Sequence, residues 1–81
     1  MMTRVLFFSL LREVVGVAEM NWPHEGPLTV EQLFAALVEQ HPALAAWRSS
    51  LLVAVDQTYV RFDAPIMPGS EVAFMPPVQG G

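Results

Sequence analysis

The sequence predicts an α+β domain in which one helix lies across a mixed β-sheet. Three observations predict it: a strand hairpin near the start, one clear helical pattern in the middle, and strand-like runs after that helix. At 81 residues the chain has room for one domain. We expect a folded part over residues 1–75 and an extended, flexible tail over residues 76–81.

The first strand is predicted over Arg4–Leu11. This stretch, RVLFFSLL, carries apolar residues on both faces of the pleat, which is typical of a central strand buried on both sides. The next residues, REVVG, predict a helical turn ended by Gly16. AEMNW alternates weakly and predicts the second strand of a hairpin, which PHEGP then breaks.

The helix over TVEQLFAALVEQHP is the clearest element of the sequence. Thr29 and Gln32 have the spacing of a capping box, in which each side chain accepts a hydrogen bond from the other's backbone N–H. Pro42 disfavours helical geometry at His41 and so marks the end of the helix. A further short turn is expected in ALAAWRSS. The apolar face of the helix is formed by Val30, Leu33, Phe34, Leu37 and Val38.

The last third of the chain predicts a second hairpin and a final strand. In LLVAVDQTYVRF two strand-like runs flank Asp56-Gln57, a plausible turn that lacks the usual glycine. Pro68-Gly69 predicts a turn before the final strand, EVAFM. In that strand Val72 and Phe74 share one face, with Glu71 and Ala73 on the other. Pro76 and Pro77 then end the sheet pairing, since proline donates no hydrogen bond.

The composition favours a protein partner and argues against nucleic acid or membrane. The formal net charge is −4, and the four basic residues are scattered arginines rather than a basic patch. No apolar run approaches the length of a membrane helix, and the first residues lack a secretory signal, so we expect a cytoplasmic protein. With 53% hydrophobic residues in so short a chain, some apolar surface should stay exposed for a partner.

Three stretches carry a resemblance to a known family: VLFFSLLREVVG, AVDQTYVRFDAPI and PGSEVAFMPPVQGG. In this order they resemble the small subunits of molybdopterin synthase, which are ubiquitin-like β-grasp sulfur carriers with a mixed sheet of four to five strands. The resemblance implies a subunit that is inactive alone. It also implies a heterotetramer with the large catalytic subunit.

The resemblance further implies a reaction cycle at the tail. An E1-like adenylating enzyme uses ATP to activate the carboxylate of Gly81, and a sulfur donor protein converts it to a thiocarboxylate. The large subunit then transfers this sulfur to cyclic pyranopterin monophosphate, in molybdenum cofactor biosynthesis. Asp56 departs from the family, which commonly has asparagine at that place.

The residue types of the tail suit that chemistry. A backbone carboxylate is an anion at neutral pH and a poor electrophile, so it needs activation. Gly80 and Gly81 lack a Cβ and can enter a narrow pocket of another protein. The chain has no cysteine, so any sulfur it carries would have to sit on the terminus. The alternative is that the two glycines are an ordinary frayed chain end with no function.

Other candidate site residues concern the partner rather than chemistry. By the family match Phe8, Tyr59 and Met75 face the large subunit; from the residues alone, a place in the core is about as plausible. Arg12 pairs with the partner or with an acidic neighbour, or it is a surface arginine that contributes little. No histidine has a second ligand at metal spacing, and no glycine-rich phosphate loop is present, so we expect no metal or bound cofactor in this chain. The partner-binding set is Phe8, Arg12, Tyr59, Met75, Pro76, Pro77 and Val78.

Three rival functions stay open from the sequence. The first is a sulfur carrier of another pathway, such as the formation of the thiamin thiazole; FF…RE and EVAFMPPV favour the molybdopterin branch. The second is a ubiquitin-like modifier whose Gly81 is joined to lysines of other proteins. The third is a plain interaction domain.

Overall fold

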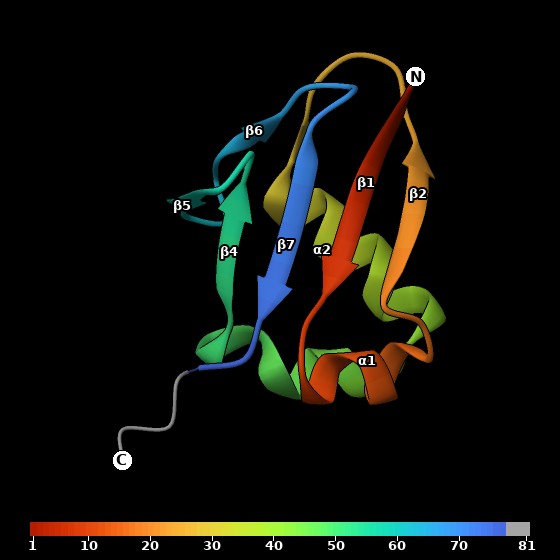
Figure 1. The fold of residues 1–81 in the computed structure, drawn as a ribbon, viewed down its shortest axis with the longest axis vertical. Helices are drawn as coiled ribbons and strands as arrows, with labels where there is room; N and C mark the ends of the chain where they lie inside the picture. Colours follow the sequence, from red (N-terminus) through yellow and green to blue (C-terminus); the bar gives the residue numbers. More distant parts are fainter. Residues whose placement is uncertain (78–81) are drawn as a thin grey trace.

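The computed structural model describes residues 1–77 and contains a five-stranded sheet with helices packed on one face (Figure 1). The strand order is β2-β1-β7-β4-β5, and only the β1–β7 pairing is parallel. This is the mixed sheet that the sequence predicts, with one main helix across it. The sheet strands are β1 (Met2–Phe7), β2 (Glu19–Pro23), β4 (Leu52–Val55), β5 (Thr58–Val60) and β7 (Glu71–Met75).

The first strand is shorter than predicted and is buried on one face only. β1 ends at Phe7, and Ser9, at φ 55°, turns the chain into helix α1 (Leu10–Val15). The prediction of a strand over residues 4–11 is therefore confirmed for residues 4–7 and wrong for residues 8–11, because the apolar run continues from β1 into helix α1, where Leu11 is buried. Thr3, Val5 and Phe7 are buried, whereas the alternate residues lie on the open face of the sheet.

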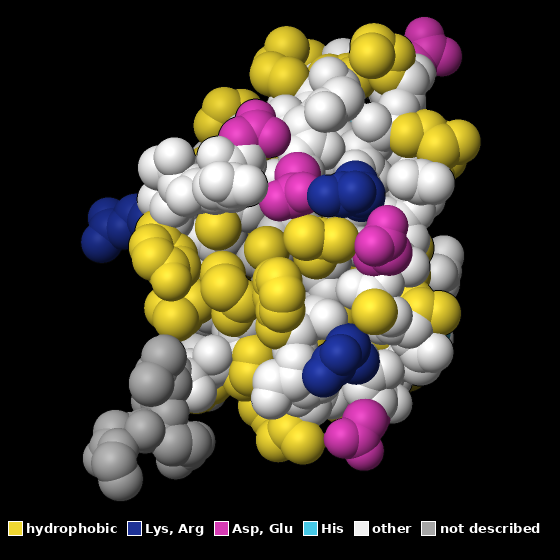
Figure 2. Space-filling model, viewed as in Figure 1, with side chains coloured by type: hydrophobic (Ala, Val, Ile, Leu, Met, Phe, Trp, Pro, Cys, Tyr) yellow, Lys and Arg dark blue, Asp and Glu magenta, His cyan; other side chains and the backbone are white. Residues whose placement is uncertain are grey.

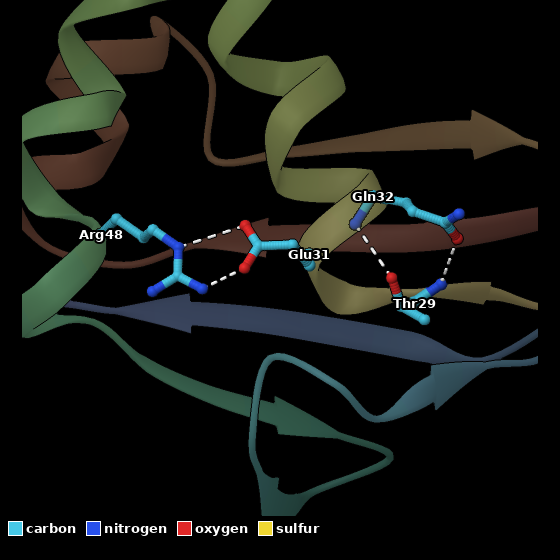
Figure 3. A network of polar contacts seen from close by, with 4 residues as sticks. All are labelled: Thr29, Glu31, Gln32 and Arg48. Atoms are coloured by element: carbon cyan, nitrogen blue, oxygen red, sulfur yellow. Dashed lines mark hydrogen bonds and ion pairs between the residues drawn. The ribbon is translucent and has the colours of Figure 1, made fainter.

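The helix-ending and helix-starting signals read from the sequence are confirmed. Gly16 caps α1 at φ 92°, and its N–H donates to the carbonyl of Arg12 at 2.7 Å. Helix α2 (Val30–Gln40) begins with the capping box: Gln32 N–H donates to Thr29 Oγ1 at 3.1 Å, and Thr29 N–H donates to Gln32 Oε1 at 2.8 Å (Figure 3). His41 is the C-cap, directly before Pro42.

A 3₁₀ helix, η1 (Pro42–Ser50), follows α2 and is longer than the short turn expected there. It covers the end of the core with Leu44, which is fully buried. Its last turn carries Arg48, which bonds through Nε and a terminal nitrogen to the carboxylate of Glu31 on α2 (Figure 3). The guanidinium also lies over the Phe62 ring, 4.2 Å from its centroid. Arg48 therefore ties η1 to the start of α2 and to the segment after β5.

The second hairpin forms at the predicted turn. Asp56 and Gln57 both have positive φ, 48° and 70°, as a two-residue turn of type I′ requires. Two short strands were not predicted from the sequence: β3 (Leu28–Thr29) and β6 (Pro65–Ile66) form a separate two-stranded sheet. Two-residue strands are too short to show a period of two.

The core lies between the sheet and α2. Phe7 and Phe74, on the paired strands β1 and β7, have ring centroids 6.1 Å apart. Phe34 of α2 contacts both Phe74, at 5.7 Å, and Phe62, at 5.5 Å with the rings perpendicular. Within residues 1–77 no helix is long and apolar enough to cross a membrane.

Candidate functional site

The open face of the sheet, on the side away from α2, carries a row of apolar side chains. Strand alternation directs Leu6 of β1, Ala73 of β7, Ala54 of β4 and Tyr59 of β5 to this face. The registers place each of these residues directly opposite the next, so the row runs across four neighbouring strands. No helix of the described chain packs on this face (Figure 1).

The centre of the row is a hollow of about 310 Å³. Its floor is formed by Ala54 and Ala73, whose methyl groups are short, while larger side chains stand around them. Hydrophobic side chains gather over β4 and β7 on this face (Figure 2). The hollow is thus shallow and largely apolar, a shape that suits an apolar side chain of another molecule. Around the floor stand Leu6, Phe8, Gln57, Tyr59, Glu71 and Met75.

Three residues proposed for the partner face come together at this hollow. Phe8, Tyr59 and Met75 all line it, although they come from separate parts of the chain. Phe8 is 45% exposed and Tyr59 is 70% exposed, so the alternative that both belong to the core is wrong. Met75 is half-buried at the end of β7. An exposed tyrosine and phenylalanine beside a hollow are typical of a protein interface.

The other predicted site residues lie elsewhere or outside the described residues. Pro76 and Pro77 follow β7 directly and are half-buried. Arg12 is exposed on α1 and does not line the hollow. Val78, Gly80 and Gly81 lie outside residues 1–77.

Sequence reasoning missed the floor of the hollow. Alanine carries no signal of its own, and only the strand register shows that Ala54 and Ala73 are partners. The alternation predicted for the final strand places Ala73 on the face away from Val72 and Phe74. This signal could have indicated that Ala73 forms part of the floor.

An ion pair borders the hollow on its polar side. Glu71 Oε2 accepts a hydrogen bond from Arg4 at 2.5 Å, and this contact raises the pKa of the Arg4 guanidinium. The backbone N–H of Glu71 donates to Asp56 Oδ1 at 2.9 Å, and Asp56 N–H donates to the carbonyl of Glu71 at 2.8 Å. The β4–β5 turn is therefore fastened to the start of β7, which fixes the wall that carries Tyr59.

The hollow can bind but offers little chemistry of its own. Its lining holds one carboxylate, already paired, and no histidine or hydroxyl apart from the Tyr59 phenol. Over residues 1–77 no three histidine, aspartate or glutamate side chains gather as metal ligands would.

The sequence and the fold are similar to those of known proteins. Residues 5–81 match the model of the ThiS family. The chain is 46% identical over 82 residues to the molybdopterin synthase sulfur carrier subunit of Escherichia coli K12, covering 99% of this chain and all of that one. Small archaeal modifier protein 1 of Haloferax volcanii has the same fold, with a TM-score of 0.83, 28% identity and complete coverage of both chains.

A third comparison concerns a complex. Subunits 1 and 2 of the molybdopterin-converting factor from Helicobacter pylori have been solved together, and a chain of that complex superposes on this one with a TM-score of 0.68 and complete coverage of both. At 21% identity this likeness shows the fold alone. The fold predicted from the sequence, a ubiquitin-like β-grasp, is confirmed by these neighbours.

Proposed function

The chain belongs to the ThiS family, and from this premise we propose that it is the sulfur carrier subunit of a molybdopterin synthase. The observation that carries the proposal is the full-length match to the E. coli sulfur carrier subunit, at 46% identity. The carrier serves molybdenum cofactor biosynthesis. It supplies sulfur to a larger subunit and does not act as an enzyme alone.

The reactive group of the proposal is the carboxylate of Gly81. An adenylating enzyme transfers AMP from ATP to this carboxylate and releases pyrophosphate. A sulfur donor protein then displaces the AMP, which leaves a thiocarboxylate on Gly81. The large subunit transfers that sulfur to cyclic pyranopterin monophosphate, and a second loaded carrier supplies the other sulfur of the molybdopterin dithiolene. Gly80 keeps the end of the chain thin enough to enter the active sites of these partners.

The open face supplies the docking energy in this proposal. Ordering a glycine tail in a partner's pocket costs about 1–2 kcal/mol of backbone entropy per residue. Burial of Phe8, Tyr59 and Met75 around the hollow against the large subunit offsets this cost. Pro76 and Pro77, the first residues of the tail, would connect the open face of the sheet to the glycines, and Val78 would enter the partner with the glycines. Arg12, which lies on α1 and apart from the hollow, is a further proposed contact with the large subunit.

The remaining partners and the compartment follow from the same proposal. The activating enzyme and the sulfur donor would each bind the carrier in turn, and the cytoplasm is the proposed compartment. The assembly would be a heterotetramer of two small and two large subunits. No cofactor is assigned to this chain, because the ATP is bound by the activating enzyme.

Intact mass spectrometry tests the proposal directly. The purified chain is incubated with an E1-like adenylating enzyme, ATP and a sulfur donor. We expect its mass to rise by the difference between sulfur and oxygen, and we expect this gain to map to Gly81. A variant with one alanine added after Gly81 is the matched control and should gain nothing. If the wild-type chain never gains sulfur, or if the extended variant supports molybdopterin synthesis without being trimmed, the proposal is wrong.

A second candidate function has an observation in its favour. The likeness to a protein named as a small archaeal modifier, at 28% identity, suits a ubiquitin-like modifier joined to lysines of other proteins. The same incubation with cell extract separates the two functions. Sulfur gain without adducts favours the carrier, whereas a ladder of adducts that requires Gly81 favours the modifier.

A further inference from the structure

A second concavity lies on the other side of Tyr59 from the hollow. It is a groove of about 450 Å³ between the end of η1, the start of β4 and the strand β5. Tyr59 lines both the groove and the hollow, so it forms a ridge between them. We call this concavity the basic groove, because the charged side chains that line it are Arg48 and Arg61.

The groove exists because the β4–β5 hairpin opens. The two strands pair from Val55–Thr58 to Val53–Val60, and no pairing continues beyond Val53. Leu52 of β4 is still paired with Met75 on its other side, at the edge of the hollow. The floor of the groove is apolar and is built largely from Leu51, Leu52 and Val60.

The two arginines of the groove differ in their contacts. Arg48 is already neutralised by Glu31 and stacked on Phe62. Arg61 is exposed, and it takes part in neither of the two ion pairs found within residues 1–77. In a chain of net charge −4, the groove therefore presents a cation beside apolar surface. Such a place is complementary to a carboxylate with an apolar neighbour.

The backbone of β5 gives the groove an edge suited to an extended segment. β5 is an edge strand of the sheet, with β4 as its one neighbour in the described residues. The backbone N–H of Asp56 donates to the carbonyl of Glu71 on β7. In an antiparallel ladder the backbone polar groups of every second residue point to the same side, so the N–H and carbonyl of Ala54 also point toward β7. Tyr59, opposite Ala54, consequently directs its N–H and carbonyl to the outer edge. An added strand could bond to both groups.

We propose that the basic groove binds an extended, acidic segment of the large subunit. The segment lies along β5, hydrogen-bonds to the Tyr59 backbone and places a carboxylate at Arg61. The groove and the hollow lie on either side of Tyr59, and in this proposal the two form one interface. The inference rests on the proposed function, since it names the large subunit as the occupant.

The test compares charge-matched variants in binding to the large subunit. Arg61→Gln and Gln40→Glu each lower the net charge by one, but Gln40 lies at the far end of α2 and not in the groove. At low salt we expect Arg61→Gln to weaken binding about threefold to fivefold, which is the upper part of the range for an exposed charge pair. This difference should shrink as salt is raised, because salt screens the pair. Gln40→Glu should bind as the wild type does.

Phe8→Ala separates this inference from the proposed function. Phe8 lines the hollow and not the groove. If Phe8→Ala weakens binding while Arg61→Gln matches Gln40→Glu, the groove proposal is overturned and the docking face stands. If neither variant changes binding, the docking face of the proposed function is wrong as well. If Arg61→Gln slows adenylation but leaves binding to the large subunit unchanged, the occupant is the activating enzyme and the proposal is overturned.

Hydrogen exchange supplies a second readout that charge alone would not move. The Tyr59 amide should exchange freely in the isolated chain and become protected in the complex with the large subunit. An amide that exchanges at the same rate in both would rule out strand addition at β5.

Discussion

Ala54 and Ala73 lie directly opposite each other on β4 and β7, with both methyl groups on the open face of the sheet. The alternate side chains of these strands point into the core, where Val53, Val72 and Phe74 are buried. The pair leaves a hollow in the middle of an apolar row, because Leu6 and Tyr59 extend the row on either side. Two small residues thus create the shape that larger neighbours surround.

Filling the hollow should block docking without harming the fold. In Ala73→Leu the longer side chain points to the open face, so it occupies the hollow without entering the core. We expect affinity for the large subunit to fall about thirtyfold or more, in the range of a hot-spot change. Calorimetric titration measures the affinity, and thermal unfolding checks the fold.

Ala35→Leu is the matched control for this variant. Ala35 is exposed on α2, on the other side of the molecule from the hollow. The same chemical change there should leave affinity as it is. Equal affinity of Ala73→Leu and the wild type would show that the hollow is not covered in the complex.

The capping box should contribute measurably to stability. Thr29 Oγ1 accepts the N–H of Gln32, one of the donors that a helix start leaves without a partner. Thr29→Ala should therefore lower the free energy of unfolding by about 1 kcal/mol. Urea denaturation measures the loss. Thr29→Ser keeps the hydroxyl and should retain most of the stability, and a serine variant as weak as the alanine one would contradict the capping role.

Much of the fold was predictable because its local signals are strong. The capping box, the Pro42 stop and the Gly16 cap act within a few residues, so the sequence carries them whole. The β4–β5 turn was also read correctly without its usual glycine, from the two apolar runs that flank it. The resemblance to sulfur carriers then supplied the β-grasp arrangement that local patterns do not contain.

The errors have a common physical cause. RVLFFSLL was read as one strand because an apolar residue on a strand and one on a helix look alike in sequence. The positive φ of Ser9 is what separates β1 from α1, and a serine in the sequence does not predict such a backbone angle. The hollow was missed in the same way, since its floor depends on which residues of β4 and β7 are opposite each other.

The Arg48–Glu31 pair should make stability depend on pH in acid. The hydrogen bond from Arg48 holds the pKa of Glu31 below its ordinary value. A carboxyl whose pKa is lowered by folding stabilises the fold fully above its unfolded pKa and loses this effect as pH falls through the folded pKa. Wild type should thus be more stable than Glu31→Gln at neutral pH, and the two should converge in acid.

Because the pair is exposed, we expect the difference to be small and to shrink in high salt. Urea midpoints of both proteins, measured from neutral pH down to about pH 3, give the comparison. A gap between the two proteins that stays constant over this range would show that Glu31 acts through packing rather than charge.

The β4–β5 turn should hold strain that a glycine relieves. Gln57 has φ 70°, and the second central position of a type I′ turn strongly favours glycine. Gln57→Gly should therefore raise the free energy of unfolding by about 0.5 kcal/mol, since the lost strain exceeds the entropy that glycine adds to the unfolded chain. Asp56→Gly is the control: its φ is also positive, but the change removes the acceptor for the Glu71 N–H, so no gain is expected. If both glycine variants gained equally, the Asp56–Glu71 bond would contribute nothing to holding the Tyr59 wall of the hollow.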